Sequence, residues 1–192
     1  TIEIQPFARV QMNVKKGTVD GSFTATVNEK RKTYSYFPEE PITTSKWVFF
    51  IRKKDKNRLK LDSYEDLKGY KVGVVREYTY TDEFWRFLKE NQIKHDIVTK
   101  DEQLFKMLAI KRIDYVAGEF INSMQLLKEN NLETEIIPLQ SFTMKEAGLY
   151  AIWSKARVEP DFVKHFSRAL KKFKTSEKYK KIYSRYFGSP SE

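Results

Sequence analysis

KVGVVREYTYTDEFWRFLKENQIKHDIVTKDEQLFKMLAIKRIDYVA, residues 71–117, alternates between short apolar runs and longer stretches with apolar residues at helical spacing. Short apolar runs predict strands, and apolar residues that recur every three or four positions predict helices. The predicted strands are residues 71–75, 93–99 and 114–117, and the predicted helices are residues 81–91, 101–110 and 121–130. This alternation is typical of a parallel sheet covered by helices, so the sequence predicts an α/β fold.

The segments on either side of this stretch continue the same kind of pattern. Trp47-Val48-Phe49-Phe50-Ile51 predicts a buried strand, and Ser63 followed by Asp66 predicts a capping box at the start of a short helix. Further helices are predicted at residues 6–16 and 160–187, and a short helical turn at residues 28–34. A strand is predicted before residue 6, and further strands at residues 19–26, 135–139 and 148–153.

Composition excludes several classes of protein. The chain has 192 residues, 40% of them hydrophobic, which is enough for a packed core of one domain or two small lobes. It has no cysteine, which excludes disulfides, thiolate metal sites and a cysteine nucleophile. No run reaches the roughly 18 apolar residues of a membrane-spanning helix, and the first residues do not resemble a signal peptide, so we expect a mature or trimmed start.

The net charge of +10 suits an acidic solute, nucleic acid or an anionic membrane, but it is also expected of a solvated lysine coat. The lysines are spread along the chain with glutamates between them, which favours the coat. The runs at residues 171–174 and 178–181 combine lysine with aromatic residues, although packing of an amphipathic terminal helix explains them better than nucleic-acid binding. We therefore predict no nucleic-acid partner.

Motifs for catalysis are missing. There is no nucleophile elbow, Walker loop, dinucleotide fingerprint or zincin motif, and the two histidines, His95 and His165, do not have the spacing of metal ligands. The residues alone therefore predict no catalytic residue, metal or cofactor.

Several phrases, taken in order, resemble the family 3 extracellular solute-binding proteins, the amino-acid-binding kind used by bacterial ABC importers. The resemblance runs nearly from end to end and implies a periplasmic-binding-protein type II fold, with two α/β lobes joined by a hinge. The phrases are PFAR (6–9), GTVDG (17–21), EKR (29–31), DLKGYKVGV (66–74), RIDYVAGE (112–119) and a lysine- and tyrosine-rich terminal helix.

The resemblance also implies where the lobes divide. Lobe 1 is expected at residues 1–46 and 144–192, and lobe 2 at residues 47–143, with the two crossings near 44–47 and 144–149. Members of the family begin with a strand and a helix that precede the segment corresponding to Thr1, and this sequence lacks both. A sheet without an inner strand has unpaired edges, so we expect a βα unit upstream of Thr1 in the natural chain.

Three residues resemble the family's grip on an amino-acid carboxylate. Thr24 and Thr26 follow the strand begun at Val19, and Arg31 comes five residues after Thr26. The planar guanidinium of arginine binds a carboxylate through a charge-assisted fork. The alternative is a surface arginine beside two ordinary strand-forming threonines.

Lobe 2 is expected to supply the remaining contacts. Tyr78 and Thr79 follow a strand and precede a helix, so amides and hydroxyls of residues 78–81 would suit an anionic group, although Glu77 stands where the family often has glycine. Glu119 stands where related binders carry an aspartate for the ligand ammonium; the alternative is an exposed acid at a helix start. Arg9 and Arg76 are further candidates for a ligand with more than one acidic group.

The resemblance thus implies periplasmic binding of a small polar solute, an amino acid or related carboxylate, by a monomer that delivers it to the membrane subunits of an ABC transporter. Two alternatives stay open. The same lobes occur as ligand-sensing domains tethered in front of membrane receptors, and some dehydratases resemble this fold, with Glu119 then a general base.

Overall fold

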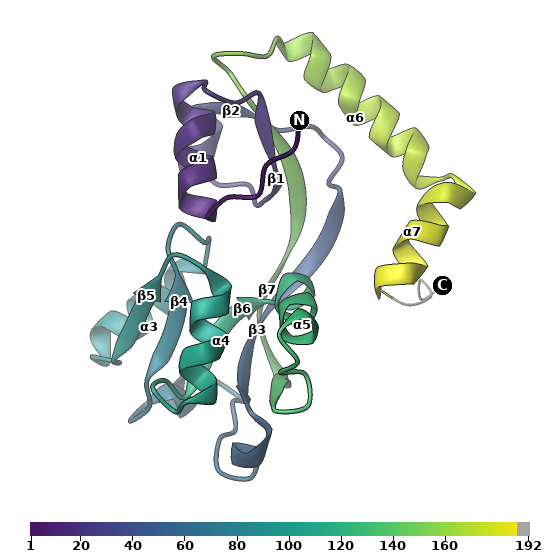
Figure 1. The fold of residues 1–192 in the computed structure, drawn as a ribbon. Helices are drawn as coiled ribbons and strands as arrows, with labels where there is room; N and C mark the ends of the chain where they lie inside the picture. The colour runs from purple at the N-terminus through teal and green to yellow at the C-terminus, as the bar shows by residue number, and fades with distance from the viewer. Residues whose placement is uncertain (188–192) are drawn as a thin grey trace. The chain divides into compact units, whose positions relative to one another are not determined.

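The computed structural model describes residues 1–187, which form two compact units. Unit 1 consists of Thr1–Arg9 and Ser45–Ala147, and unit 2 of Val10–Thr44 and Gly148–Glu192. Helices and strands alternate along both units, so the predicted α/β class is confirmed (Figure 1). Two strands, β3 (Thr43–Arg52) and β7 (Ile136–Ser154), contribute residues to both units.

Unit 1 contains a sheet with the strand order β3-β6-β4-β5. Its parallel strands are β4 (Val72–Val75), β5 (His95–Val98) and β6 (Tyr115–Glu119), and β3 pairs with β6 in the antiparallel direction. The helices of the unit are η1 (Lys53–Asp55), η2 (Tyr64–Leu67), α3 (Asp82–Glu90), α4 (Asp101–Ala109) and α5 (Phe120–Glu129). The sheet is therefore mixed, and the prediction of a parallel sheet holds for β4, β5 and β6 only.

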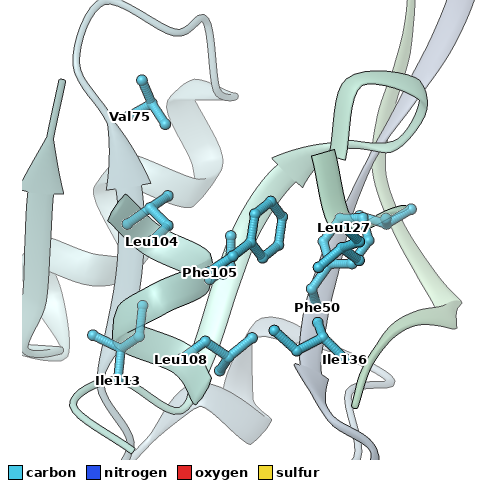
Figure 2. Packing of buried hydrophobic residues seen from close by; sticks show 10 residues of the cluster. Phe50, Val75, Leu104, Phe105, Leu108, Ile113, Leu127 and Ile136 are labelled. Atoms are coloured by element: carbon cyan, nitrogen blue, oxygen red, sulfur yellow. The ribbon is translucent and has the colours of Figure 1, made fainter. Parts of the chain in front are cut away.

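Strand β3 is buried on both faces, and its alternating side chains serve two cores. Phe50 packs edge-on against Phe105 of α4, with 5.5 Å between ring centroids, in the cluster that also contains Leu104, Leu108 and Leu127 (Figure 2). Phe49 points to the other face, where its ring lies 5.8 Å from Phe84 of α3 and 6.3 Å from Tyr115. Because side chains alternate along a strand, one apolar run supplies both cores.

Arg52 is the last residue of β3, and it is a buried cation with only 3% of the residue exposed. Its Nη1 donates 2.7 Å hydrogen bonds to the carbonyl oxygens of Leu108 and Ile113, and its Nε donates to Asp55. Its Nη2 lies 3.4 Å from Asp114 Oδ1. The guanidinium thus joins the end of β3 to the connection between α4 and β6.

Unit 2 contains α1 (Phe7–Lys16), which begins in unit 1, and the short elements β1 (Gly21–Ala25), α2 (Glu29–Lys32) and β2 (Ser35–Tyr36). Both short strands pair with β7 in the antiparallel direction. A Cβ on Gly21 would lie 2.3 Å from the carbonyl oxygen of Ile152, so the close approach of β1 to β7 requires glycine there. Trp153 of β7 packs edge-on against Phe162 and Phe166, at 4.9 and 5.1 Å.

The local predictions fail in four places. Residues 1–6 have no regular structure where a strand is predicted, and β2 was not predicted. Residues 135–139 and 148–153 belong to the single strand β7, whose middle is too polar and exposed to give a strand signal. The terminal helix is broken into α6 (Pro160–Lys174) and α7 (Glu177–Phe187), because Ser176 Oγ accepts the Tyr179 amide and starts a new helix.

Candidate functional site

The carboxyl ends of β4 and β6 bring polar side chains together in unit 1. Glu119 is the last residue of β6 and the N-cap of α5, and the segment 76–81 joins β4 to α3. In parallel α/β sheets, loops and helix starts converge at this edge, which is where ligands bind. The unit 1 candidates Arg76, Tyr78, Thr79 and Glu119 all lie on these two connections.

The Glu119 carboxylate is buried, with 7% of the residue exposed. It accepts amide hydrogen bonds from Ile121 at 2.8 Å and Asn122 at 2.9 Å, and a third from the Ser45 hydroxyl of β3. Glu119 is therefore a helix-start acid, as in the alternative interpretation, but not an exposed one. Because a carboxylate has about four acceptor positions, three donors leave capacity for a ligand group.

Burial raises the pKa of Glu119 above its ordinary value. The hydrogen bonds from Ser45, Asn122 and Ile121 lower the pKa, and the charge of Asp101 raises it further. Desolvation penalises the charged form of a carboxyl group, so a cation beside Glu119 would be bound with extra strength.

Asp101, the first residue of α4, is a second acid in the same neighbourhood. The Tyr78 hydroxyl donates a 2.7 Å hydrogen bond to Asp101 Oδ2, and the Asn122 side chain also hydrogen-bonds this carboxyl group. Burial raises the pKa of Asp101 despite these bonds, and burial together with the Asp101 charge raises the pKa of Tyr78. Two acids with raised pKa values thus lie where the sequence predicts an anion cradle, and this surrounding favours a cationic group.

Thr79 lies near a cation from β7. The Lys145 ammonium donates a hydrogen bond to the Thr79 carbonyl oxygen and lies 4.4 Å from the centroid of the Trp47 ring. Trp47 is opposite Glu119 in the β3–β6 register and is 4% exposed. Lys145 is therefore held by a carbonyl and an aromatic face next to the strand that carries Glu119.

Arg76 and Glu77 form the turn that leaves β4. The Arg76 side chain is exposed, and its amide donates 2.8 Å to the carbonyl oxygen of Val98. Glu77 has φ 64°, a left-handed conformation that favours glycine. The backbone thus keeps a glycine-like turn here although the residue is glutamate.

Unit 2 joins two of its three candidates. Arg31 of α2 is 3% exposed, and its Nη1 donates to the Thr26 carbonyl oxygen at 2.8 Å and to the Thr26 hydroxyl at 2.9 Å. The Asn28 side chain caps α2 by accepting the Arg31 amide at 2.7 Å. Arg31 is therefore not a surface cation, and Thr26 orients its guanidinium.

Thr24 carries backbone strain at the same end of β1. Its φ is 61°, and the register between β1 and β7 shifts between Ser22 and Ala25. A β-branched residue in the left-handed region is an outlier that costs about 1–3 kcal/mol, and such strain clusters at functional sites. Thr24 is exposed and its hydroxyl donates 2.8 Å to the Phe23 carbonyl oxygen.

Arg9 stands apart from the other candidates. It lies on α1 with an exposed side chain, and within residues 1–187 no hydrogen bond or ion pair joins that side chain to another candidate. The described contacts thus connect Thr26 with Arg31 and, through Asp101 and Asn122, Tyr78 with Glu119.

Sequence reasoning missed Asp101, Ser45 and Lys145. Asp101 had a usable signal, because it follows strand β5 directly at a helix start, just as Glu119 follows β6. Ser45 and Lys145 had none, since they come from strands far away in the sequence and reach Glu119 and Thr79 only through the fold.

Within the described residues, no group of three or more histidine or acidic side chains is arranged to hold a metal ion. In the same part of the chain, none of the helices has the length and apolar character needed to cross a bilayer.

Solved structures with the same fold include proteins of several kinds. An ancestral arginine-binding protein bound to arginine has a TM-score of 0.82 and 22% identity, covering 98% of this chain and 80% of that one. A histidine kinase sensor domain with similarity to periplasmic binding proteins has a TM-score of 0.78, 20% identity and coverages of 98% and 79%. An ancestral amino-acid-binding protein described as a precursor of cyclohexadienyl dehydratase has a TM-score of 0.79, 18% identity and coverages of 97% and 77%.

These likenesses show the periplasmic-binding-protein type II fold and confirm the predicted fold class. A comparison with curated protein sequences gave no match. The model of one family, the bacterial extracellular solute-binding proteins of family 3, matches residues 1–189. The family supports ligand binding as the general role and implies an extracytoplasmic location. Together with the fold, this match shows that the chain belongs to the family 3 bacterial extracellular solute-binding proteins.

Proposed function

We propose that the chain binds an amino acid or a related small carboxylate in the periplasm. The observation that carries the proposal is the buried guanidinium of Arg31, fixed by the carbonyl and hydroxyl oxygens of Thr26. The guanidinium of arginine is a planar, permanently charged fork of N–H donors, and Thr26 fixes the orientation of this fork. A carboxylate suits such a fork, because its two oxygens match the guanidinium plane.

Each unit contributes its own group of side chains under this proposal. In unit 2, Arg31 and Thr26 bind the ligand carboxylate with help from Thr24. In unit 1, Glu119 binds the ligand ammonium, as the raised pKa of this buried acid supports. Tyr78, Thr79, Arg76 and Arg9 complete the set of candidates and select the ligand side chain.

We propose that residues 1–46 and 144–192 form lobe 1 and residues 47–143 form lobe 2, although Thr1–Arg9 belong to unit 1 by their contacts. The division of the chain by internal contacts falls between Thr44 and Ser45 and between Ala147 and Gly148, which supports hinge crossings at these positions. A ligand that contacts both lobes shifts the hinge equilibrium toward the closed state.

Delivery of the solute to ABC-transporter membrane subunits by a monomer is the role we favour. The second candidate is ligand sensing, which the likeness to a histidine kinase sensor domain supports. A dehydratase-like activity ranks third. It would use Glu119 as a general base, for which a raised pKa is favourable, and a neighbouring structure is described as a precursor of a dehydratase.

A thermal-shift screen tests the proposal directly. The purified chain is heated with amino acids, small dicarboxylates, polyamines and nucleotides, and its melting temperature is followed. An amino acid or organic acid is expected to stabilise the protein in a concentration-dependent way, because a ligand that binds only the folded state raises its stability. If only polyanions stabilise the protein, and salt removes the effect, amino-acid binding is the wrong function.

The role of Glu119 predicts a pH dependence of affinity. A carboxylate binds an ammonium only when it is charged, and the pKa of Glu119 is raised. As the pH is lowered, the affinity for the amino acid found in the screen should therefore begin to fall at a pH above about 4.3, the ordinary pKa of glutamate. Glu119→Gln should lower affinity about 10- to 100-fold near neutral pH and flatten this dependence.

Isothermal titration calorimetry over a pH series measures both effects. Glu133→Gln is the matched control, since Glu133 is exposed and lies outside the candidate site. Glu119→Gln protein that is folded and binds as tightly as the control would remove Glu119 from the site.

A further inference from the structure

The last two helices carry most of the net charge of the protein. The segment Pro160–Phe187 contains nine lysine and arginine residues and two acidic residues, Asp161 and Glu177, in a chain whose net charge is +10. The rest of the chain is close to neutral by comparison. Lysines occur along the whole chain, but the excess of positive over negative charge is concentrated on these two helices.

Helix α6 has a buried side and, next to it, a stripe of basic residues. Val163 and Ser167 are buried, and Ser167 Oγ accepts the Glu40 amide at 3.2 Å. Lys164, Arg168 and Lys171 are exposed and follow one another at spacings of four and three residues, which places them on one stripe of the helix.

Helix α7, which follows α6 after the break at Thr175 and Ser176 (Figure 1), repeats this arrangement. Its inward face includes Tyr179, whose hydroxyl donates to the Ile42 carbonyl oxygen at 3.4 Å. Its outward face has a second stripe at spacings of three and four residues, made of three exposed residues: Lys178, Lys181 and Arg185.

A large apolar side chain lies beside the basic stripe of α7 but not beside that of α6. Phe162 and Phe173 of α6 are on the side of the helix away from Lys164, Arg168 and Lys171, and their rings pack against Trp153 and Tyr179. Ile182 is 44% exposed, follows Lys181 directly and lies four residues after Lys178, so it borders the basic stripe of α7. Lysine and arginine on one face with an exposed isoleucine at its border suit a helix that lies in a membrane interface.

We propose that α7 docks the protein onto an anionic phospholipid surface. The basic stripe of α7 attracts the headgroups, the neighbouring charge of α6 adds to this attraction, and Ile182 enters the boundary between headgroups and acyl chains. Nucleic acid would be attracted by the same charges, but the apolar border gives it no contact, and an extracytoplasmic family meets membrane surfaces. Membrane docking would hold the solute-binding chain next to the bilayer.

Vesicle co-sedimentation of the full chain tests the proposal. The protein is mixed with vesicles of phosphatidylglycerol and phosphatidylcholine in equal amounts, or of phosphatidylcholine alone, and its partitioning is measured. Binding is expected only to the phosphatidylglycerol vesicles, and added salt should weaken it. The triple variant Lys178→Gln, Lys181→Gln, Arg185→Gln should bind on the order of a hundredfold more weakly, since each basic residue near the surface contributes to attraction.

A triple variant in η1 and the residue that follows it provides the matched control. Lys53, Lys54 and Lys56 are exposed, so changing them to glutamine removes the same charge elsewhere, and vesicle binding should change by less than about threefold. Glutamine preserves the helix propensity of α7, and circular dichroism checks that both variants are folded. An equal loss in both triple variants would show that net charge alone is responsible, and would overturn the proposal.

The variant Ile182→Ser distinguishes binding to lipid from binding to nucleic acid. This change should weaken vesicle binding and leave retention on a DNA column unchanged, because only a bilayer offers the isoleucine an apolar contact. Equal binding to both kinds of vesicle, or vesicle binding that the triple variant in α7 and Ile182→Ser leave intact, would overturn the docking surface without bearing on solute binding.

Discussion

Arg52→Ala is expected to lower the free energy of unfolding by about 3–5 kcal/mol, the range measured when one partner of a buried charge pair is removed. Arg52 is 3% exposed, and its guanidinium satisfies the carbonyl oxygens of Leu108 and Ile113 and the carboxylate of Asp55. Alanine would leave these acceptors without their donor, and buried acceptors without partners cost about 1–3 kcal/mol each. Urea denaturation followed by circular dichroism measures the loss.

Arg58→Ala is the control, because Arg58 pairs with the same Asp55 from a position 51% exposed. Water can solvate the exposed side of Asp55 when the Arg58 side chain is removed, so the loss of unfolding free energy should stay below about 1 kcal/mol. A loss for Arg52→Ala no larger than the loss for Arg58→Ala would contradict the structural role of Arg52.

The same network predicts how stability depends on pH. Burial alone would raise the pKa of Asp55, but hydrogen bonds and charge from Arg52 and Arg58 outweigh burial and lower it. A lowered carboxyl pKa contributes stability above the unfolded value of about 3.9, and this contribution is lost as the pH falls through the folded value. Arg52→Ala should therefore lose less stability on acidification than the wild-type protein.

Arg31→Ala is expected to weaken binding of the amino acid found in the screen by about 2–5 kcal/mol, the cost of leaving a desolvated carboxylate without its partner. This loss corresponds to a dissociation constant roughly 30- to 5,000-fold higher. Arg31→Lys should recover part of the affinity, because lysine restores the charge without the planar fork. Isothermal titration calorimetry measures all three proteins.

Two checks accompany this measurement. Lys30→Ala, at the exposed neighbouring position, should bind like the wild type. Thermal melting must show that Arg31→Ala is folded, since the Arg31 guanidinium also binds Thr26. A folded Arg31→Ala protein with unchanged affinity would place the carboxylate site elsewhere.

Much of unit 1 could be predicted from the sequence, because its signals are local. The apolar run at 47–51, the Ser63–Asp66 capping box and the alternation over residues 71–117 all correspond to elements of the structure. Strand direction could not be predicted in the same way. The antiparallel pairing of β3 with β6 depends on how the chain returns to the sheet, and no local pattern in the run at 47–51 encodes it.

The chemistry of the candidate site was predictable only in its residue types. The resemblance gave Thr26 and Arg31 as carboxylate ligands and put Glu119 after the strand at 114–117. The structure joins Arg31 to Thr26 by hydrogen bonds, which was not predicted, and has Glu119 at the end of β6. The two amides that Glu119 accepts follow from its position at a helix start, but the resemblance did not reveal that the Ser45 hydroxyl also binds Glu119, or that Asp101 accepts the Tyr78 hydroxyl. Ser45 and Asp101 are the partners that were missed. Those partners come from other strands and helix starts, so they depend on the folded arrangement and not on spacing along the chain.

The position of Lys145 over Trp47 gives the protein a built-in optical reporter. Indole emission responds to a charge held over the ring, and here that charge lies 4.4 Å from the ring centroid. Trp47 is also the cross-strand neighbour of Glu119, so a change in the charge of Glu119 takes place beside the indole ring. Under the proposed binding of a ligand ammonium by Glu119, we therefore expect the intrinsic fluorescence of Trp47 to report ligand arrival without a dye, once Trp85→Phe and Trp153→Phe remove the other two emitters.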